Sequence, residues 1–146
     1  MLRMAVTLCF EGRLMLRPTQ EQNSLRSEPN GTLPIWVDFQ GLQPVACPCG
    51  LARRAFQDQP DVPYTMHVTE ILNTAKPHYH KLMTETYFIL ECDSNAFLEL
   101  DGRQVPVVPG LACLIPPGVV HRGIGRMKVL IVVTPKFDSS DEFVVE

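Results

Sequence analysis

Prolines and glycines interrupt this sequence so often that they leave little room for long helices. The chain contains 13 prolines, far above ordinary usage, and 9 glycines. Proline ends or kinks a helix because it has no backbone N–H and its ring clashes with the preceding turn. Between these residues lie short runs rich in β-branched and aromatic side chains, and we find no long amphipathic helix. This pattern predicts an all-β fold, either a sandwich or a barrel.

The clearest strand predictions come from alternation and from turn residues. Residues 64–72 (YTMHVTEIL) alternate roughly, as a half-buried strand does, whereas residues 86–91 (TYFILE) are apolar on both faces, as in a strand packed between layers. Asp101-Gly102 separates two strand-like runs and predicts a hairpin, because both residues tolerate positive φ. Residues 51–56 fit either a strand or a helical turn. Further strands are expected at 35–39, 77–82, 111–115, 119–122, 127–134 and the C-terminal end.

The length of 146 residues is that of one ordinary domain. We expect residues 35–146 to form a single β-barrel domain and residues 1–34 to form an N-terminal segment with a polar arm, since residues 17–34 are rich in turn formers. The apolar run at residues 4–10 is far too short to span a membrane, and no cleavage site follows it. The sequence therefore predicts neither a membrane anchor nor a targeting segment.

Charge and cysteine content exclude two further classes. The net charge is −3, and the basic residues are scattered along the chain, so nucleic acid is not an expected partner. The 5 cysteines are an odd number in a chain of this size, which is not typical of a disulfide framework. We therefore expect a cytoplasmic protein.

Three of the 4 histidines form a pattern typical of a metal site. His78 and His80 are two residues apart, so on an extended strand their imidazoles share a face. Glu85 lies an odd number of residues from His80, so a turn at residues 81–84 must precede the strand that returns its carboxylate to that face. His121 follows the turn sequence Pro-Pro-Gly-Val-Val. Three imidazole nitrogens and one carboxylate oxygen suit a divalent transition ion.

These residues resemble the two motifs of the cupin superfamily, G-x5-H-x-H-x3,4-E-x6-G and G-x5-P-x-G-x2-H-x3-N. The resemblance spans about residues 63–134, although Asn73, Cys92 and Gly125 replace motif residues that are not ligands. It implies a cupin-type double-stranded β-helix, or jelly-roll barrel, with an N-terminal arm, and cupin relatives often form homodimers. The matching positions are His78, His80, Glu85, Gly110, Pro116, Gly118 and His121, and the resemblance implies that His78, His80, Glu85 and His121 hold the metal.

A divalent ion held by three histidines and one glutamate keeps one positive charge and, if it is six-coordinate, two open positions. Such an ion can polarise substrate oxygens or lower the pKa of bound water, and its charge favours an anionic substrate. The ligand types do not separate iron, manganese, nickel, cobalt and zinc. We expect a small-molecule enzyme of the dioxygenase, decarboxylase or isomerase type that acts on a compact anionic metabolite. The alternative is a non-catalytic metal- or ligand-binding module used for sensing or storage; the sequence names no catalytic residue.

Other reactive residues have a structural and a functional interpretation. His67 is interpreted as a surface or hydrogen-bonded histidine, with a general base beside the pocket as the alternative. Cys47 and Cys49 are interpreted as structural thiols rather than as a zinc or redox pair, because no second cysteine pair accompanies them. Arg53 and Arg54 are interpreted as surface charges, with a clamp for a carboxylate or phosphate at the barrel mouth as the alternative.

Strand parity and proximity suggest the pocket walls. Tyr87 and Ile89 share the parity of Glu85 and should face the same interior, whereas the side chains between them should face the opposite layer. Met83 and Arg122 are close in sequence to the predicted ligands and could approach a substrate.

Overall fold

A computed structural model of the protein describes residues 34–146. The chain divides into two units, Met1–Trp36 and Val37–Glu146, and residues 34–36 have no regular secondary structure. The apolar run at residues 4–10 and nearly all of the predicted arm lie outside the described residues. Within residues 34–146, none of the helices is long and apolar enough to cross a membrane.

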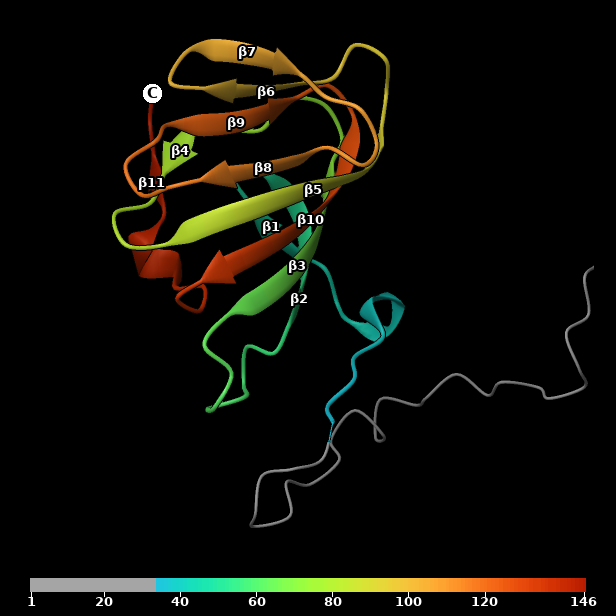
Figure 1. Cartoon of the computed structure of the whole chain (residues 1–146), viewed down its shortest axis with the longest axis vertical. Coiled ribbons are helices and arrows are strands. Elements are labelled where there is room, and N and C mark those ends of the chain that lie inside the picture. Colours follow the sequence, from blue (N-terminus) through green and yellow to red (C-terminus); the bar gives the residue numbers. More distant parts are fainter. Residues whose placement is uncertain (1–33) are drawn as a thin grey trace, which may run out of the picture. The chain divides into compact units, whose positions relative to one another are not determined.

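The unit Val37–Glu146 is built from two antiparallel sheets (Figure 1). The larger sheet has the order β1 (Val45–Cys47), β2 (Gly50–Ala55), β3 (Thr65–Ile71), β10 (Met127–Thr134), β5 (Thr84–Cys92) and β8 (Ala112–Ile115). The smaller sheet has the order β11 (Phe143–Val144), β4 (His78–Tyr79), β9 (His121–Ile124), β6 (Phe97–Leu100) and β7 (Arg103–Pro106). Two short 3-10 helices, η2 (Phe39–Gly41) and η3 (Ser139–Asp141), complete the described elements. The all-β barrel prediction is confirmed.

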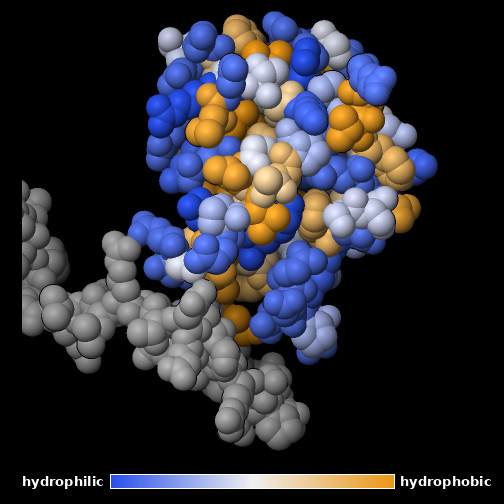
Figure 2. Space-filling model, turned by 180° about the vertical axis from the view of Figure 1, so that it is seen from behind, coloured by the Kyte–Doolittle hydropathy of each residue, from blue (hydrophilic) through white to orange (hydrophobic). Residues whose placement is uncertain are grey.

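Alternation along the central strands builds the core. Every second residue of β3 and β10 is buried, including Ile71, Val129 and Ile131, because successive side chains of a strand point to opposite faces. Leu98 of β6 is also fully buried and belongs to the same core. Each such side chain contributes roughly 1.5–3 kcal/mol when it leaves water. On the face opposite to that of Figure 1, apolar side chains lie in small groups among polar ones (Figure 2).

The predicted hairpin at Asp101-Gly102 is confirmed. Both residues have positive φ, 47° and 78°, and they join β6 to β7 with Leu100 paired to Arg103. The Asp101 carboxylate also accepts a hydrogen bond from the backbone N–H of Val120, 2.9 Å away. The turn therefore supports the segment that leads into β9.

Three strand predictions need correction. Residues 35–39 form no strand: the Asp38 carboxylate accepts a hydrogen bond from Gln40 N at 3.0 Å and begins η2 instead. The strand predicted at 77–82 is reduced to His78–Tyr79, because Asp141 accepts the backbone N–H groups that follow. The strand β5 is not covered on both sides, since Phe88 and Leu90 on its outer face are 41% and 37% exposed.

Candidate metal centre

The structure brings the four predicted ligand residues together in the interior. His78 lies on β4, His80 directly after it, Glu85 on β5 and His121 on β9. His78 and His121 are directly paired between β4 and β9. All four side chains are buried, and their ligand atoms lie within 4.8 Å of one another. We call these four residues the His–Glu cluster.

The turn between His80 and Glu85 is held by a residue far along the chain. The Asp141 carboxylate accepts hydrogen bonds from the backbone N–H groups of Lys81, Leu82 and Met83, at 2.9, 2.9 and 3.0 Å. These bonds satisfy the backbone N–H groups of the turn that the sequence predicts between His80 and Glu85. Asp141 also accepts a hydrogen bond from His80 through its backbone carbonyl, so one residue orients both the turn and the imidazole.

The segment before His121 is fixed by a glycine. Gly118 has φ of 86°, a conformation that favours glycine because it has no Cβ. Its backbone N–H donates to the carbonyl oxygen of His80 at 2.7 Å. A hydrogen bond therefore joins the bend predicted from Pro-Pro-Gly to the backbone of the ligand residue His80.

Backbone carbonyls set the orientation of all three imidazoles. The Nδ1 atoms of His78, His80 and His121 lie 2.9, 2.8 and 3.0 Å from the carbonyl oxygens of Lys76, Asp141 and Val119. A carbonyl oxygen can only accept, so each Nδ1 carries the proton and donates it. Each Nε2 then faces the interior, where it can give its lone pair to an ion or, in His80 and His121, carry a proton toward Glu85 when no ion is bound.

The Glu85 carboxylate lies among these nitrogens. Its Oε2 atom is 2.9 Å from His121 Nε2 and 3.5 Å from His80 Nε2. Burial alone would raise the pKa of Glu85, but its contacts with His121 and His80 outweigh burial and hold the pKa far below its usual range. The carboxylate is therefore ionised and supplies one negative charge.

Two of the histidines indicate that the cluster suits a cation. The pKa of His78 is lowered to about 4, first by burial and then by the charge of His121. The Nε2 atom of His80 is buried and has no hydrogen-bond partner among the described residues. A neutral ring, an unpartnered nitrogen and an ionised carboxylate all facing one point fit a divalent cation.

The sequence did not predict that Cys49 and Glu142 lie beside the ligand residues. Cys49 Sγ lies 3.9 Å from His78 Nε2, and Cys49, His78 and Glu142 form a second group whose ligand atoms lie within 4.8 Å of one another. Since His78 Nδ1 is bonded to a carbonyl, both groups depend on the same Nε2 atom. They are therefore two sides of one site and not two separate metal sites.

The Cys47-Pro48-Cys49 turn joins β1 to β2 and carries free thiols. Hydrogen bonding from Cys49 lowers the pKa of Cys47 to about 7 in spite of its burial. The same pairing, together with burial, raises the pKa of Cys49 well above its usual value. No zinc cluster forms around the pair alone, since the metal-capable group within residues 34–146 that contains Cys49 also needs His78.

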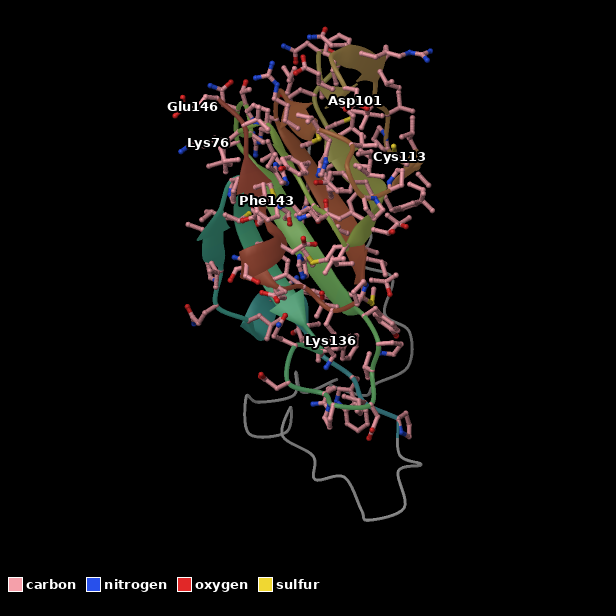
Figure 3. The ribbon with its side chains drawn as sticks, turned by 90° about the vertical axis from the view of Figure 1, so that its left-hand side faces the viewer. Lys76, Asp101, Cys113, Lys136, Phe143 and Glu146 are labelled. Atoms are coloured by element: carbon pink, nitrogen blue, oxygen red, sulfur yellow. The ribbon has the colours of Figure 1, made fainter. Side chains whose placement is uncertain are left out.

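A cavity of about 850 Å³ opens beside the cluster. Cys47, Arg54, Phe137 and Glu142 are among the residues that line it. Glu142 also has a carboxylate oxygen within 4.8 Å of a His78 ring nitrogen, so this lining residue borders the cluster. Lys136, another lining residue, lies in the lower half of Figure 3, well below Asp101 of the β6–β7 turn. Neither this cavity nor a second one, of about 430 Å³, is lined by any of the four cluster residues themselves.

The two neighbouring arginines, predicted as surface charges or as an anion clamp, have different surroundings. Arg53 pairs with Glu70, with Nη1 2.9 Å from Oε1, whereas Arg54 lines the cavity. Arg122 pairs with Glu99 at 2.8 Å and does not line this cavity.

Residues predicted to face the interior mostly do so. Tyr87 and Ile89 are buried on the face of Glu85. Met83 is 1% exposed and belongs to the core rather than to the cavity wall. His67 is also buried, with Nε2 3.0 Å from Thr65 Oγ1, so the hydrogen-bonded interpretation applies and the surface one does not.

Solved structures show the same fold. No protein-family profile matches the chain, and a search of curated proteins gives no match. A crystal structure of a protein from Planctomyces limnophilus is 37% identical, covers 77% of this chain and 97% of its own, and superposes with a TM-score of 0.73. Streptomyces Pac13, a nucleoside dehydratase solved with uridine, is 16% identical over 78% of this chain and 92% of its own, with a TM-score of 0.66.

Ectoine synthase from P. lautus is also similar in fold. It is 14% identical over 77% of this chain and 91% of its own, with a TM-score of 0.62. The antiparallel barrel that the two histidine motifs imply is thus present in this structure and shared with these proteins, and the chain belongs to the cupin superfamily.

Proposed function

We propose that this protein is a metal-dependent enzyme of the dioxygenase, decarboxylase or isomerase type that acts on a compact anionic small molecule. The observation that carries the proposal is the His–Glu cluster. Its three imidazoles are oriented by backbone carbonyls so that their Nε2 atoms face the Glu85 carboxylate. Building and burying such a set without a cation would leave polar atoms poorly paired, which is costly.

His78, His80, Glu85 and His121 would hold one ion of iron, manganese, nickel, cobalt or zinc. When bound, such an ion supplies Lewis-acid chemistry toward substrate oxygens. A divalent ion bound to one ionised carboxylate and three neutral imidazoles would keep a net positive charge, which favours an anionic substrate. The adjoining cavity of about 850 Å³ is within the range that small-molecule sites occupy.

The solved structures support an enzymatic role without selecting the reaction. Pac13 is named a nucleoside dehydratase, and another protein of this fold, from P. lautus, is named an ectoine synthase. Oxalate decarboxylase from Bacillus subtilis, 17% identical with a TM-score of 0.60, covers 75% of this chain and 31% of its own. Barrels of this fold therefore accommodate several reactions on small molecules.

Metal analysis of the purified protein tests the site. The wild type should contain about one transition ion per chain, and His80→Ala and His121→Ala should each lose it, because each removes one of the ligand atoms. His67→Gln is the matched control, since His67 is buried but is not part of the cluster. Unchanged metal content in the two ligand variants would overturn the site assignment.

Turnover is tested separately on protein fully loaded with iron, manganese or nickel. Oxygen consumption and product formation are measured with a panel of small acids, diketones and phenols. Turnover that disappears in His80→Ala supports the enzyme. Full loading without turnover of any compound would favour the non-catalytic sensing or storage module.

We also propose that the protein forms a homodimer. The outer face of the larger sheet carries exposed apolar side chains, among them Phe88 and Leu114. These two lie on the neighbouring strands β5 and β8, and β8 is an edge strand. A second copy would cover this face and protect the edge.

A further inference from the structure

Strand alternation places the two neighbouring arginines of β2 on opposite faces of the sheet. Arg54 is paired with His67, which points into the barrel, whereas Arg53 is paired with Val68 on the outer face. Arg53 Nη1 donates to Glu70 Oε1 at 2.9 Å, so its charge has a partner. Arg54 forms no ion pair with any residue in the part of the chain that the structure describes, 34–146.

The Arg54 side chain is held in place by packing. Its Cζ atom lies 4.1 Å from the centroid of the Phe137 ring, a cation–π contact that fixes the guanidinium while leaving its N–H edge available. The Nε atom of Arg54 is buried without a hydrogen-bond partner among the described residues. The Nε atom of Arg53 is buried in the same way, but Arg53 donates through Nη1, whereas no hydrogen bond among residues 34–146 uses the Arg54 guanidinium.

Arg54 is also the cation with unused donors in the cavity beside the His–Glu cluster. The other cation that lines this cavity, Lys136, donates from Nζ to the backbone carbonyls of Gln57 and Gln59. Glu142 lines the same cavity and has a carboxylate oxygen within 4.8 Å of a His78 ring nitrogen, so the cavity that contains Arg54 borders the cluster.

We propose that Arg54 selects the substrate by binding a carboxylate group, while the rest of that molecule reaches the His–Glu cluster. A guanidinium fork matches a planar carboxylate with two parallel hydrogen bonds. Asp138 and Glu142 also line the cavity, and their carboxyl groups disfavour a doubly charged phosphate more than a singly charged carboxylate. The inference rests on the proposed function and adds to it the substrate class and the residue that recognises it.

Calorimetric titration with sodium lactate, sodium acetate and inorganic phosphate tests this, with lactamide as the uncharged control. Each compound is titrated into metal-free and cobalt-loaded protein. The wild type should bind the carboxylates more tightly than phosphate or lactamide. Arg54→Gln should weaken carboxylate binding by roughly 10-fold or more, because it removes charge-assisted hydrogen bonds. Arg53→Gln, whose side chain faces the other side of the sheet, should stay within about twofold of wild type.

Metal content keeps this proposal distinct from the proposed function. Arg54→Gln should retain the cobalt content of the wild type, since Arg54 is not part of the cluster. Carboxylate binding by a wild type that takes up no metal would overturn the proposed function and leave Arg54 as the carboxylate site. Four results would each overturn the role of Arg54. Two concern the variants: equal effects of Arg53→Gln and Arg54→Gln on carboxylate binding, or loss of cobalt in Arg54→Gln. Two concern the wild type: tighter binding of phosphate than of the carboxylates, or no carboxylate binding.

Discussion

The four histidines differ in what their ring nitrogens face. In the cluster each Nδ1 donates to a backbone carbonyl, whereas His67 places Nε2 3.0 Å from the Thr65 hydroxyl. Thr65 Oγ1 also accepts the backbone N–H of Phe137 at 3.2 Å, so its hydroxyl proton is available to the neutral His67 ring. The His67 and Phe137 rings also form a T-shaped pair, with centroids 5.3 Å apart. His67 is therefore built into the wall as a neutral residue.

We predict that His67 makes the protein less stable in mild acid. Its pKa is lowered to about 4, first by burial and then by the Arg54 charge, from an ordinary value of 6.5. Between pH 6.5 and pH 4 the unfolded chain therefore binds more protons than the folded chain. The neutral His67 contributes fully to the free energy of unfolding above pH 6.5, and this contribution falls as the pH drops toward 4. At pH 5 the loss should approach about 2 kcal/mol.

Urea unfolding of metal-free wild type and His67→Asn at pH 7 and pH 5 measures this effect. Asparagine does not titrate in this range but can still hydrogen-bond to Thr65. The wild type should lose more stability than the variant between the two pH values. Parallel losses in the two proteins would show that His67 does not titrate as its burial requires.

Spacing was sufficient to find the cluster but not its neighbours. His78, His80, Glu85 and His121 were predicted from offsets along local strands and turns, and the structure brings them together. Cys49 was interpreted as a structural thiol. Its approach to His78 depends on how the β1–β2 hairpin folds over β4, which local sequence does not specify.

The turn between β4 and β5 depends on an element at the other end of the domain. The helix η3 places Asp141 against a turn about 60 positions earlier, where its carboxylate accepts three backbone N–H groups. Oδ1 accepts the backbone N–H of Lys81, and Oδ2 accepts those of both Leu82 and Met83. An asparagine can supply only one of these two oxygens.

We therefore predict that Asp141→Asn weakens metal binding although it removes no ligand. The turn that spaces His80 from Glu85 would lose part of its support, and changes of this kind typically cost about 10- to 100-fold in metal affinity. Competition titration with cobalt measures the change. Asp138→Asn is the matched control, because among residues 34–146 that exposed carboxylate accepts hydrogen bonds only from Ser140 of η3. Equal affinities in Asp141→Asn and the wild type would contradict the supporting role.

Elements defined by local chemistry were predicted best. The Asp101-Gly102 hairpin follows from two residues that accept positive φ, and β10 spans the predicted residues 127–134. The strand predicted at 77–82 is shorter because a distant carboxylate competes for its N–H groups. At residues 35–39, Asp38 capped η2 where an apolar cluster suggested a strand.

At the scale of the whole molecule, the alternation that fills the barrel also leaves its outer sheet face apolar. Strand register aligns two outward rows across β3, β10, β5 and β8. They are Val68, Leu130, Phe88 and Ala112 in one row and Met66, Val132, Thr86 and Leu114 in the other. The sequence predicted β5 as apolar on both faces but assigned a second layer to its outer side, where Phe88 is 41% exposed. A contiguous apolar face of this kind marks an interaction surface.

We predict that this face joins two copies of the protein. Light scattering during size exclusion should give the mass of a dimer for the wild type and of a monomer for the double variant Phe88→Glu, Leu114→Glu, because charges facing each other across a two-fold interface would lose their water and repel. Leu82→Glu is the control, since Leu82 is 72% exposed, lies in the turn after β4 and belongs to neither row. A wild type that elutes as a monomer at every concentration would contradict the dimer. Dissociation of Leu82→Glu instead of the double variant would place the interface elsewhere.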